Sequence, residues 1–286
     1  MIDLHLHTTA SDGRSTPEQL VRRLAAEGIR TFALTDHDTT AGIAAATAAA
    51  APLGLRVIPG IEVTSVHQGI DLHLLGYFFD PDHVELIDFL VAQREDRRRR
   101  VREMIDRLAS LGIVLNVQSI MKKASQMTGK ALGRPVIARL LVAKGHARDI
   151  ADAFDRFLAT GRPAFVARRG ATPADVIALI GRAGGLVSFA HPGKLGQDDL
   201  IPVLAAAGLG AIEVFHPDHN DATTARYAAM ARALGLATSG GSDYHGPRSG
   251  RAEALGRVNL PPEAFEAFEQ LARRAASIRR SAGGAA

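Results

Sequence analysis

The sequence contains no cysteine and no tryptophan among its 286 residues. Without cysteine the chain cannot form a disulfide scaffold, and any metal site must use nitrogen and oxygen ligands. Charged residues make up only 22% of the chain, against 47% hydrophobic residues, and this balance excludes full intrinsic disorder. The length fits either two small domains or one barrel-sized domain with an insertion.

Signals for export and for membrane insertion are also lacking. The first residues carry acids and histidines, where a signal peptide would have a basic patch and then an apolar run. The most apolar stretch, residues 42–55, is mostly alanine, contains Pro52 and is shorter than the roughly 20 residues that a membrane span needs. We therefore expect a soluble, cytoplasmic protein. Its net charge of +4 is too small to indicate nucleic-acid binding by itself.

Short apolar segments alternate with helical patterns along most of the chain. Strands are predicted at residues 2–7, 31–35, 56–63, 70–79, 185–190, 211–215 and 237–239. Helices are predicted between many of them, for example at residues 17–27 and 173–183, where a Thr-Pro pair marks the start. Repeated βα units predict an α/β fold with a mainly parallel sheet and outer helices. Seven such strands would suit a small barrel.

The middle of the chain interrupts this alternation. Residues 82–163 show helical patterns and almost no strand, which predicts a helical insertion between two parts of a barrel, at residues 1–81 and 164–286. In its first helix, apolar residues recur at helical spacing. They are Val101, Ile105, Leu108 and Leu111.

The same helix carries four consecutive arginines, at residues 97–100. Such a run is typical either of a nucleic-acid patch or of a solvated helix face. Glu95 and Arg99, and likewise Glu103 and Arg107, have the i,i+4 spacing of ordinary surface ion pairs. This spacing favours the solvated face.

Several of the eleven histidines fall where a predicted strand ends. Successive side chains of a strand alternate in direction, so His5 and His7 point to one side while Leu4 and Leu6 point to the other. Further histidines and acids lie in the predicted strands, at their ends or in the loops that follow. They are Asp12, His37, Glu62, His73, His191, Asp243 and His245. Sites of parallel barrels lie at the carboxyl ends of strands. The pattern therefore predicts a site for two or three divalent cations.

These motifs resemble those of the polymerase and histidinol phosphatase (PHP) superfamily of metal-dependent phosphoesterases. The matching motifs, in chain order, are His5-x-His7 with Asp12, Thr35-Asp36-His37, Gly60-Ile61-Glu62, His73, Ala190-His191-Pro192 and Ser242-Asp243-x-His245. The segments TTASDG, TDHDTT and GRPVIARLLV are similar to those of bacterial nucleoside 3',5'-bisphosphate phosphatases and 5'-to-3' exoribonucleases. The resemblance implies a distorted seven-stranded (βα) TIM-like barrel with a helical insertion domain that acts as a substrate lid.

The resemblance also implies how metal ions would be held. One ion would bind His5, His7, Glu62 and Asp243; a second would bind Glu62, His73 and His191; a third would bind Asp12, His37 and His245. Manganese, iron and zinc all suit nitrogen and oxygen ligands, so the residue types do not choose among them. Three further aspartates, Asp3, Asp36 and Asp38, would either orient imidazole rings or serve as turn and strand-end residues.

A metal-bridged water would then be the nucleophile, and no covalent nucleophile is required. Arg134, in the insertion, is the first candidate for binding a substrate phosphate, and Arg162 and Lys194 are further candidates. His216 or His219 would either donate a proton to the leaving group or lie in a solvated loop.

The leading prediction is a metal-dependent phosphoesterase that hydrolyses phosphate monoesters of nucleotides such as nucleoside 3',5'-bisphosphates. The alternative is a 5'-to-3' exonuclease that acts on short RNA or DNA. A non-catalytic, metal-stabilised binding module is less favoured, because such a module should have lost ligands and all nine are present. Neither a membrane nor an obligate protein partner is predicted.

Overall fold

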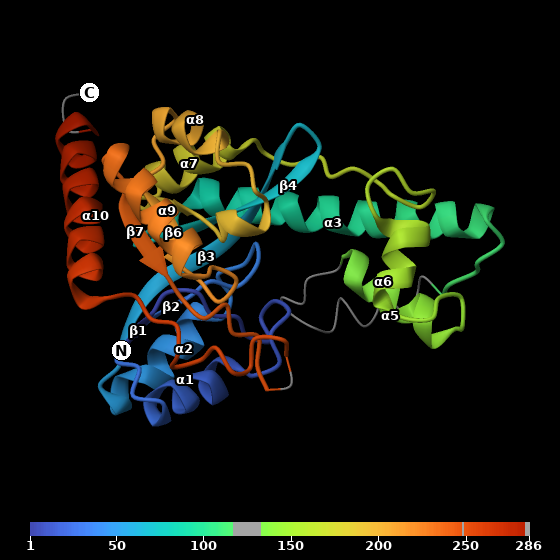
Figure 1. Ribbon diagram of the computed structural model, residues 1–286, viewed down its shortest axis with the longest axis horizontal. Coiled ribbons are helices and arrows are strands. Elements are labelled where there is room, and N and C mark those ends of the chain that lie inside the picture. Colours follow the sequence, from blue (N-terminus) through green and yellow to red (C-terminus); the bar gives the residue numbers. More distant parts are fainter. Residues whose placement is uncertain (117–132, 248, 284–286) are drawn as a thin grey trace.

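The computed structural model describes residues 1–116, 133–247 and 249–283, and its largest part is a seven-stranded barrel-like sheet (Figure 1). The strands are β1 (Ile2–Asp3), β2 (Thr31–Leu34), β3 (Arg56–His67), β4 (Ile70–Tyr77), β5 (Leu186–Phe189), β6 (Ala211–Phe215) and β7 (Ala237–Gly240). They neighbour one another in sequence order. All seven predicted strand positions are confirmed, with β1 shorter and β3 longer than expected.

Strand β4 departs from the expected parallel arrangement. It runs antiparallel to both β3 and β5, whereas the other neighbouring pairs are parallel. The reason is local, because a two-residue turn of Gln68 and Gly69, both with positive φ, joins β3 to β4 and can only connect antiparallel strands.

The sheet closes between its first and last strands. Leu6 forms a parallel bridge with Tyr244, and the His7 amide donates to the Tyr244 carbonyl at 3.0 Å. Close approach at this seam requires glycine at position 241, because a Cβ there would lie 2.3 Å from the His5 amide nitrogen. The closure brings the residues that follow β1 beside those that follow β7.

Helices cover the outside of the barrel (Figure 1). Those around it are α1 (Pro17–Ala26), α2 (Ile43–Ala50), η1 (Ala51–Leu53), α7 (Pro173–Arg182), η3 (Pro192–Lys194), α8 (Leu200–Ala206), α9 (Asp221–Ala233) and α10 (Pro262–Gly283). Both predicted helix starts are confirmed, since Thr16 and Thr172 each cap the helix in a reciprocal capping box. Among the described residues no helix is long and apolar enough to cross a membrane. The cytoplasmic location stays a prediction.

The described parts of the segment between β4 and α7 are mainly helical, and some of them form a lobe beside the barrel (Figure 1). It contains α3 (Val84–Ser110), α5 (Arg134–Ala143), α6 (Ile150–Ala153) and η2 (Phe154–Leu158). Val101, Ile105 and Leu108 pack with Ile137 and neighbouring residues in a cluster of their own. Leu111 lies beyond the helix and is 47% exposed. Residues 117–132 fall outside the described residues, and the exact domain boundaries stay predictions.

The expected solvated face of residues 97–100 is wrong for two of the four arginines. Arg97 and Arg100 are buried, with 8% and 4% of their surface exposed. Residues three apart share a helix face, and this face turns toward the barrel rather than toward solvent. Arg98 and Arg99 do lie on the surface side, where Arg99 pairs with Asp96 and Glu103.

The expected partner of Arg107 is also different, because its guanidinium donates to the Phe165 carbonyl rather than pairing with Glu103.

Candidate metal centre

The nine predicted ligands come together at one end of the barrel. His5, His7 and Asp12 follow β1; His37 follows β2; Glu62 and His73 lie on β3 and β4; His191 follows β5; Asp243 and His245 follow β7. The rings of His5 and His7 are 5.1 Å apart, as expected for side chains on one face. His191 and Asp243 adopt left-handed backbone conformations, with φ of 30° and 51°. Such strained conformations are common at functional sites.

Glu62 lies at the centre of this cluster and is almost fully buried. Its Oε1 is 2.7 Å from His73 Nδ1 and 3.1 Å from His191 Nε2. Its Oε2 is 3.3 Å from Nε2 of both His5 and His7. The two oxygens of one carboxylate thus face two different sets of histidines, which is the arrangement of a bridging ligand.

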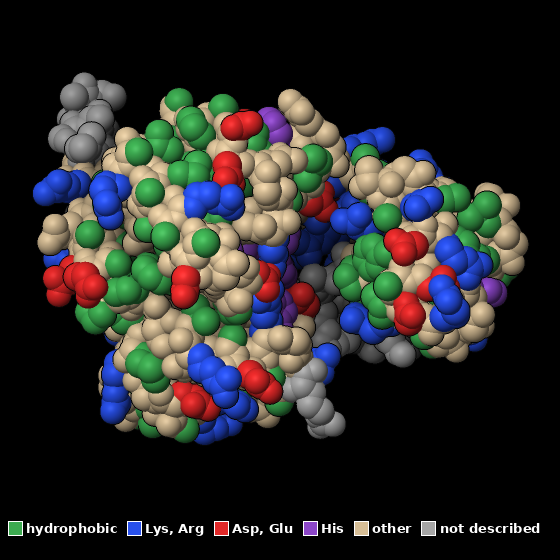
Figure 2. Space-filling model, viewed as in Figure 1, with side chains coloured by type: hydrophobic (Ala, Val, Ile, Leu, Met, Phe, Trp, Pro, Cys, Tyr) green, Lys and Arg blue, Asp and Glu red, His purple; other side chains and the backbone are tan. Residues whose placement is uncertain are grey.

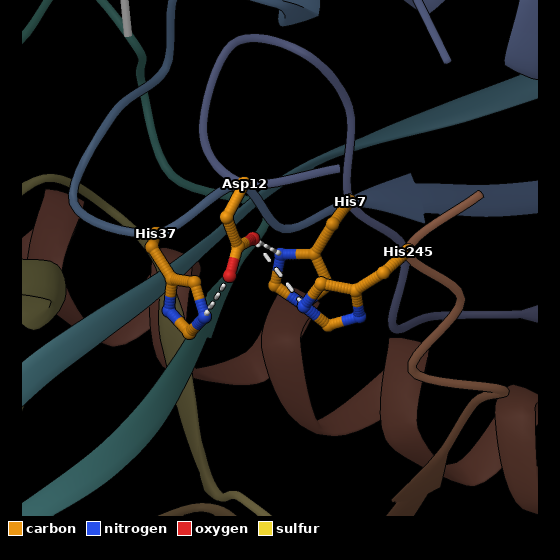
Figure 3. Close-up of side chains that lie close together, drawn as sticks. All are labelled: His7, Asp12, His37 and His245. Atoms are coloured by element: carbon orange, nitrogen blue, oxygen red, sulfur yellow. Dashed lines mark ion pairs between the residues drawn. The ribbon is translucent and has the colours of Figure 1, made fainter. Parts of the chain in front are cut away.

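A second acidic residue, Asp12, lies between histidines from different loops (Figure 3). Its Oδ1 is 3.3 Å from His245 Nε2, and its Oδ2 is 3.8 Å from His37 Nε2. His37 also reaches Glu62, because its Nδ1 is 3.1 Å from Glu62 Oε2. His37 therefore links the Asp12 group to the Glu62 group.

The donor set fits divalent metal ions. Within the described residues, four groups of three or four ligand atoms each lie within 4.8 Å of one another. Both ring nitrogens of His7 are buried and, among those residues, have no hydrogen-bond partner; the same is true of His191 Nδ1. An unsatisfied buried nitrogen is costly, and a bound cation would satisfy the His7 Nε2 that faces Glu62 and Asp243.

Charge interactions inside the cluster also suit a cation. Burial alone would raise the pKa of Glu62, but the neighbouring imidazoles, His37 and His73 foremost, hold it well below its ordinary value. Burial lowers the pKa of His37 to about 3 and that of His191 to about 4. Burial alone would also lower the pKa of His7, but the carboxylates of Asp243 and Glu62 raise it to about 10. The carboxylates are therefore ionised, and they attract positive charge to the centre of the cluster.

Glu213, on β6, positions two of the candidate ligands and was not predicted. His5 Nδ1 lies 2.7 Å from Glu213 Oε1, and the His191 amide donates to Glu213 Oε2 at 2.7 Å. The Glu213 carboxylate thus holds the Nδ1 proton of His5 and leaves Nε2 available to a metal ion. The sequence does contain a signal, since an acid within the apolar strand Ala211–Phe215 must be buried with a partner.

The three aspartates predicted as possible partners of imidazoles hold other groups. Asp3 accepts from the His5 and Ser242 amides, Asp36 accepts from Thr8 and Ser11, and Asp38 accepts from the Thr64 amide and pairs with Arg97. In these bonds they act as turn and strand-end residues, the second of the two roles considered.

The two histidines considered as proton donors, His216 and His219, form hydrogen bonds with other groups of the protein. His219 accepts from the Gly193 amide and donates to the Val214 carbonyl, so its ring holds the turn after β5. His216 is buried, and its Nδ1 accepts from the Asp218 amide at 3.1 Å. A neutral His216 then carries its proton on Nε2, which lies 3.3 Å from Asp243 Oδ2.

The Asp243 carboxylate has two different sides. Its Oδ1 is 3.4 Å from His5 Nε2 and 3.3 Å from His7 Nε2. Its Oδ2 faces three donors: Lys194 Nζ at 3.2 Å, His216 Nε2 at 3.3 Å and Arg251 Nε at 3.4 Å. Donors on Oδ2 leave Oδ1 turned toward the candidate ligands. Arg251, which sequence reasoning missed, also pairs with Asp218.

A cavity of about 550 Å³ opens onto Asp12, His37 and His73. Figure 2 shows a hollow between the barrel and the helical lobe, with histidine inside it and basic side chains around it. The arginines that line the cavity are Arg14, Arg97, Arg100, Arg134, Arg139 and Arg168. Of the three predicted phosphate contacts, Arg134 lines the cavity, Lys194 lies at Asp243, and Arg162 is exposed and absent from the described lining.

Comparisons with known proteins agree with this geometry. Residues 3–109 match the model of the PHP domain. The chain is 35% identical to the 3',5'-nucleoside bisphosphate phosphatase of Chromobacterium violaceum, over 91% of this chain and 93% of that protein. It is 36% identical to the 5'-3' exoribonuclease Rnm of Escherichia coli, over 86% and 85% of the two chains.

A crystal structure from Bifidobacterium adolescentis, provisionally described as a metal-dependent phosphoesterase, superimposes with a TM-score of 0.81. The two chains are 29% identical, and the match covers 94% of this chain and 96% of the other.

Proposed function

From the premise that this chain belongs to the PHP domain family, and so is a metal-dependent hydrolase of phosphoester bonds, we propose that it removes phosphate from nucleotides. The preferred substrate class is a small nucleotide with more than one phosphate group, such as a nucleoside 3',5'-bisphosphate. One observation carries this proposal: nine candidate nitrogen and oxygen ligands gather at Glu62 and the neighbouring Asp12 and Asp243, beside a cavity lined by arginines. The Chromobacterium violaceum relative supports the substrate class by its name.

Two to three manganese, iron or zinc ions would be held in this centre. His5, His7, Glu62 and Asp243 would hold one; Glu62, His73 and His191 a second; Asp12, His37 and His245 a third. The distances from both Glu62 oxygens support a bridging role for that residue. When bound, such ions activate water as the nucleophile and neutralise charge on phosphoryl oxygens.

The protein's own residues orient this centre. Glu213 fixes the ring of His5, and His216, Lys194 and Arg251 turn Oδ1 of Asp243 toward His5 and His7. We therefore assign His216 a positioning role at Asp243, in place of proton donation to the leaving group.

No side chain is assigned a covalent role. Ser11 is buried and donates to Asp36, which also accepts from Thr8, and this network in the loop after β1 gives Ser11 a structural explanation. Attack by water follows from this assignment.

Substrate phosphate would meet Arg134, which lines the same cavity as the candidate ligands Asp12, His37 and His73. Its guanidinium carbon lies 5.8 Å from the ring centres of both Phe154 and Phe165, and Nη2 is 3.4 Å from Asp71. The two rings limit the positions of the side chain, and a planar guanidinium can bind two phosphate oxygens.

The second candidate function is 5'-to-3' exonuclease activity on short RNA or DNA, and the Escherichia coli relative favours it by name. The cavity serves either activity at one terminal nucleotide. A long strand would need further contacts along its backbone, and the described arginines of the cavity gather at one place.

The experiment is product analysis of the metal-loaded protein. Metal-free protein, prepared by chelation and gel filtration, should be inactive, and added Mn²⁺ should restore turnover. A panel of nucleoside monophosphates, 3',5'-bisphosphates and oligonucleotides then identifies the substrate class. Release of inorganic phosphate from the bisphosphate at the highest kcat/KM supports the phosphatase. Release of mononucleotides from oligonucleotides at a higher kcat/KM favours the exonuclease, and full turnover without metal would overturn both.

A further inference from the structure

In addition to Arg134, three arginines with buried side chains line the cavity. Arg97 and Arg100 come from α3, and Arg168 comes from the segment that returns from the insertion to the barrel. The Arg168 side chain is 8% exposed, similar to Arg97 at 10%. Charged side chains are seldom buried this far unless they are paired.

The carboxylates near these arginines are too few for the cations. Arg97 and Arg168 share Asp38, and Arg168 shares Asp71 with Arg134. The Arg168 contacts are long, at 3.6 Å to Asp38 and 3.7 Å to Asp71. Among the described side chains that line the cavity, six arginines stand against two aspartates, Asp12 and Asp71. One of these, Asp12, belongs to the candidate metal centre. Asp96 also acts on Arg100 and Arg168, but it is paired with Arg99.

Several donor groups of the cluster also lack acceptors. In the described parts of the chain, Nε of Arg97 and both Nε and Nη1 of Arg168 are buried without a hydrogen-bond partner. An ion pair that served only to fix the fold would satisfy its buried donors, because each unsatisfied one is costly. The unpartnered N–H groups therefore point to an anionic ligand.

Electrostatics supports the same conclusion. Burial, followed by repulsion from Arg168, lowers the pKa of Arg97 to about 9 and that of Arg100 to about 10. Burial lowers the pKa of Arg168 as well. A bound anion would relieve this repulsion.

We propose that Arg97, Arg100 and Arg168 form an anion subsite that binds a second, non-reacting phosphate group of the substrate. The subsite and the candidate ligands Asp12, His37 and His73 line the same cavity, whose volume of about 550 Å³ is within the range of small-molecule sites. The inference rests on the proposed function and deepens it: the chain selects substrates that carry two phosphate groups. Arg100 also donates to the Val166 carbonyl, at 3.2 and 3.1 Å, and this bond holds its guanidinium in place.

The test begins with binding in the absence of metal. Adenosine 3',5'-bisphosphate, adenosine 5'-monophosphate and inorganic phosphate are titrated calorimetrically into metal-free protein. Each of the three carries a phosphate group that can occupy the subsite, so each should bind to the wild-type protein. Arg168→Gln removes the charge, and it should weaken bisphosphate binding about 10- to 150-fold, the loss expected for one charge-assisted contact. Arg168→Lys keeps the charge without the paired donors. Its affinity for the bisphosphate should lie between that of the wild type and that of Arg168→Gln.

The matched control is Arg169→Gln, because Arg169 is the exposed neighbour and is not part of the described cavity lining. This control should bind the bisphosphate like the wild type. In the metal-loaded enzyme, Arg168→Gln should reduce the ratio of kcat/KM for bisphosphate over monophosphate by a similar factor. Thermal unfolding of each variant reports whether it is folded.

Equal losses of kcat/KM on bisphosphate and monophosphate in the metal-loaded enzyme would overturn the subsite, and so would a loss of binding in Arg169→Gln equal to that in Arg168→Gln. A metal-free wild-type protein that binds neither the bisphosphate nor inorganic phosphate would overturn it as well. Because the binding arm contains no metal, it decides the subsite even if the loaded enzyme hydrolyses neither nucleotide, a result that would instead refute the proposed function.

Discussion

Replacing Glu213 by glutamine changes one atom, and the structure predicts a large effect on metal binding. Glu213 is fully buried and uses its two oxygens for two different partners, the His5 Nδ1 and the His191 amide, both at 2.7 Å. Both partners need an acceptor. Glutamine offers one acceptor oxygen and one amide nitrogen that only donates.

Either orientation of the glutamine side chain is unfavourable. If its oxygen keeps the His191 amide, its NH₂ group faces His5 Nδ1, which must then accept. The His5 proton moves to Nε2, the nitrogen that faces Glu62 and Asp243, and that nitrogen can no longer ligate a metal ion. In the opposite orientation the NH₂ group faces the His191 N–H, and two donors meet in a buried site.

The expected magnitude follows from the cost of losing a partner that orients a ligand, about 10- to 100-fold in metal affinity. This corresponds to about 1.4–2.8 kcal/mol. The measurement is competition for Mn²⁺ with a chelator of known affinity, together with metal content by mass spectrometry after dialysis. Glu253→Gln, whose side chain is 90% exposed, is the matched control. A folded Glu213→Gln protein with wild-type Mn²⁺ affinity and content would refute the positioning role of Glu213.

Four further changes test other parts of the centre and the cavity. His37→Ala should lower kcat strongly while part of the metal is retained, because the group of His5, His7 and Glu62 does not include His37. Metal content beside a His67→Ala control decides this, and complete metal loss would contradict it. His216→Leu should weaken metal binding about 10- to 100-fold. His216→Gln should weaken it less, because glutamine keeps a donor toward Asp243. An equal loss of metal affinity in both variants would instead make His216 a ligand. Arg134→Ala should cost about 10- to 150-fold in kcat/KM for a bisphosphate and less for a monophosphate, with exposed Arg162→Ala as the control. The KM for oligonucleotides should stop falling after a few nucleotides and depend weakly on salt; a steady fall to about ten nucleotides, with a slope near 0.7 log units per phosphate, would favour the exonuclease.

The strands, and the meeting of the candidate ligands at one end of the barrel, could be predicted from the sequence because both depend on local patterns. An apolar run followed at once by a histidine or an acid fixes the strand and places the ligand at its carboxyl end, as at His37 and His191. The direction of β4 was also within reach of local signals, since Gln68 and Gly69 leave room only for a hairpin turn.

Residues whose roles depend on long-range packing were harder to predict. In the sequence, Arg97 and Arg100 look like surface residues. The spacing of apolar residues predicts the helix, but it does not predict which charged face of the helix packs against the barrel. The burial of both arginines follows from how α3 lies against the barrel. The same limit applies to Arg251, which reaches Asp218 and Asp243 from a distant loop.

The loop after β2 connects the two halves of the proposed substrate site. His37 turns toward Glu62 and Asp12, while its neighbour Asp38 turns toward Arg97 and Arg168. Asp38 has a positive φ of 49° and accepts from the Thr64 amide at 2.8 Å, so the loop is fixed to β3 and cannot easily shift. Consecutive residues of a fixed loop therefore set the separation between the candidate metal centre and the proposed anion subsite. A fixed separation selects substrates by the distance between their two phosphate groups, which a flexible lid alone could not do.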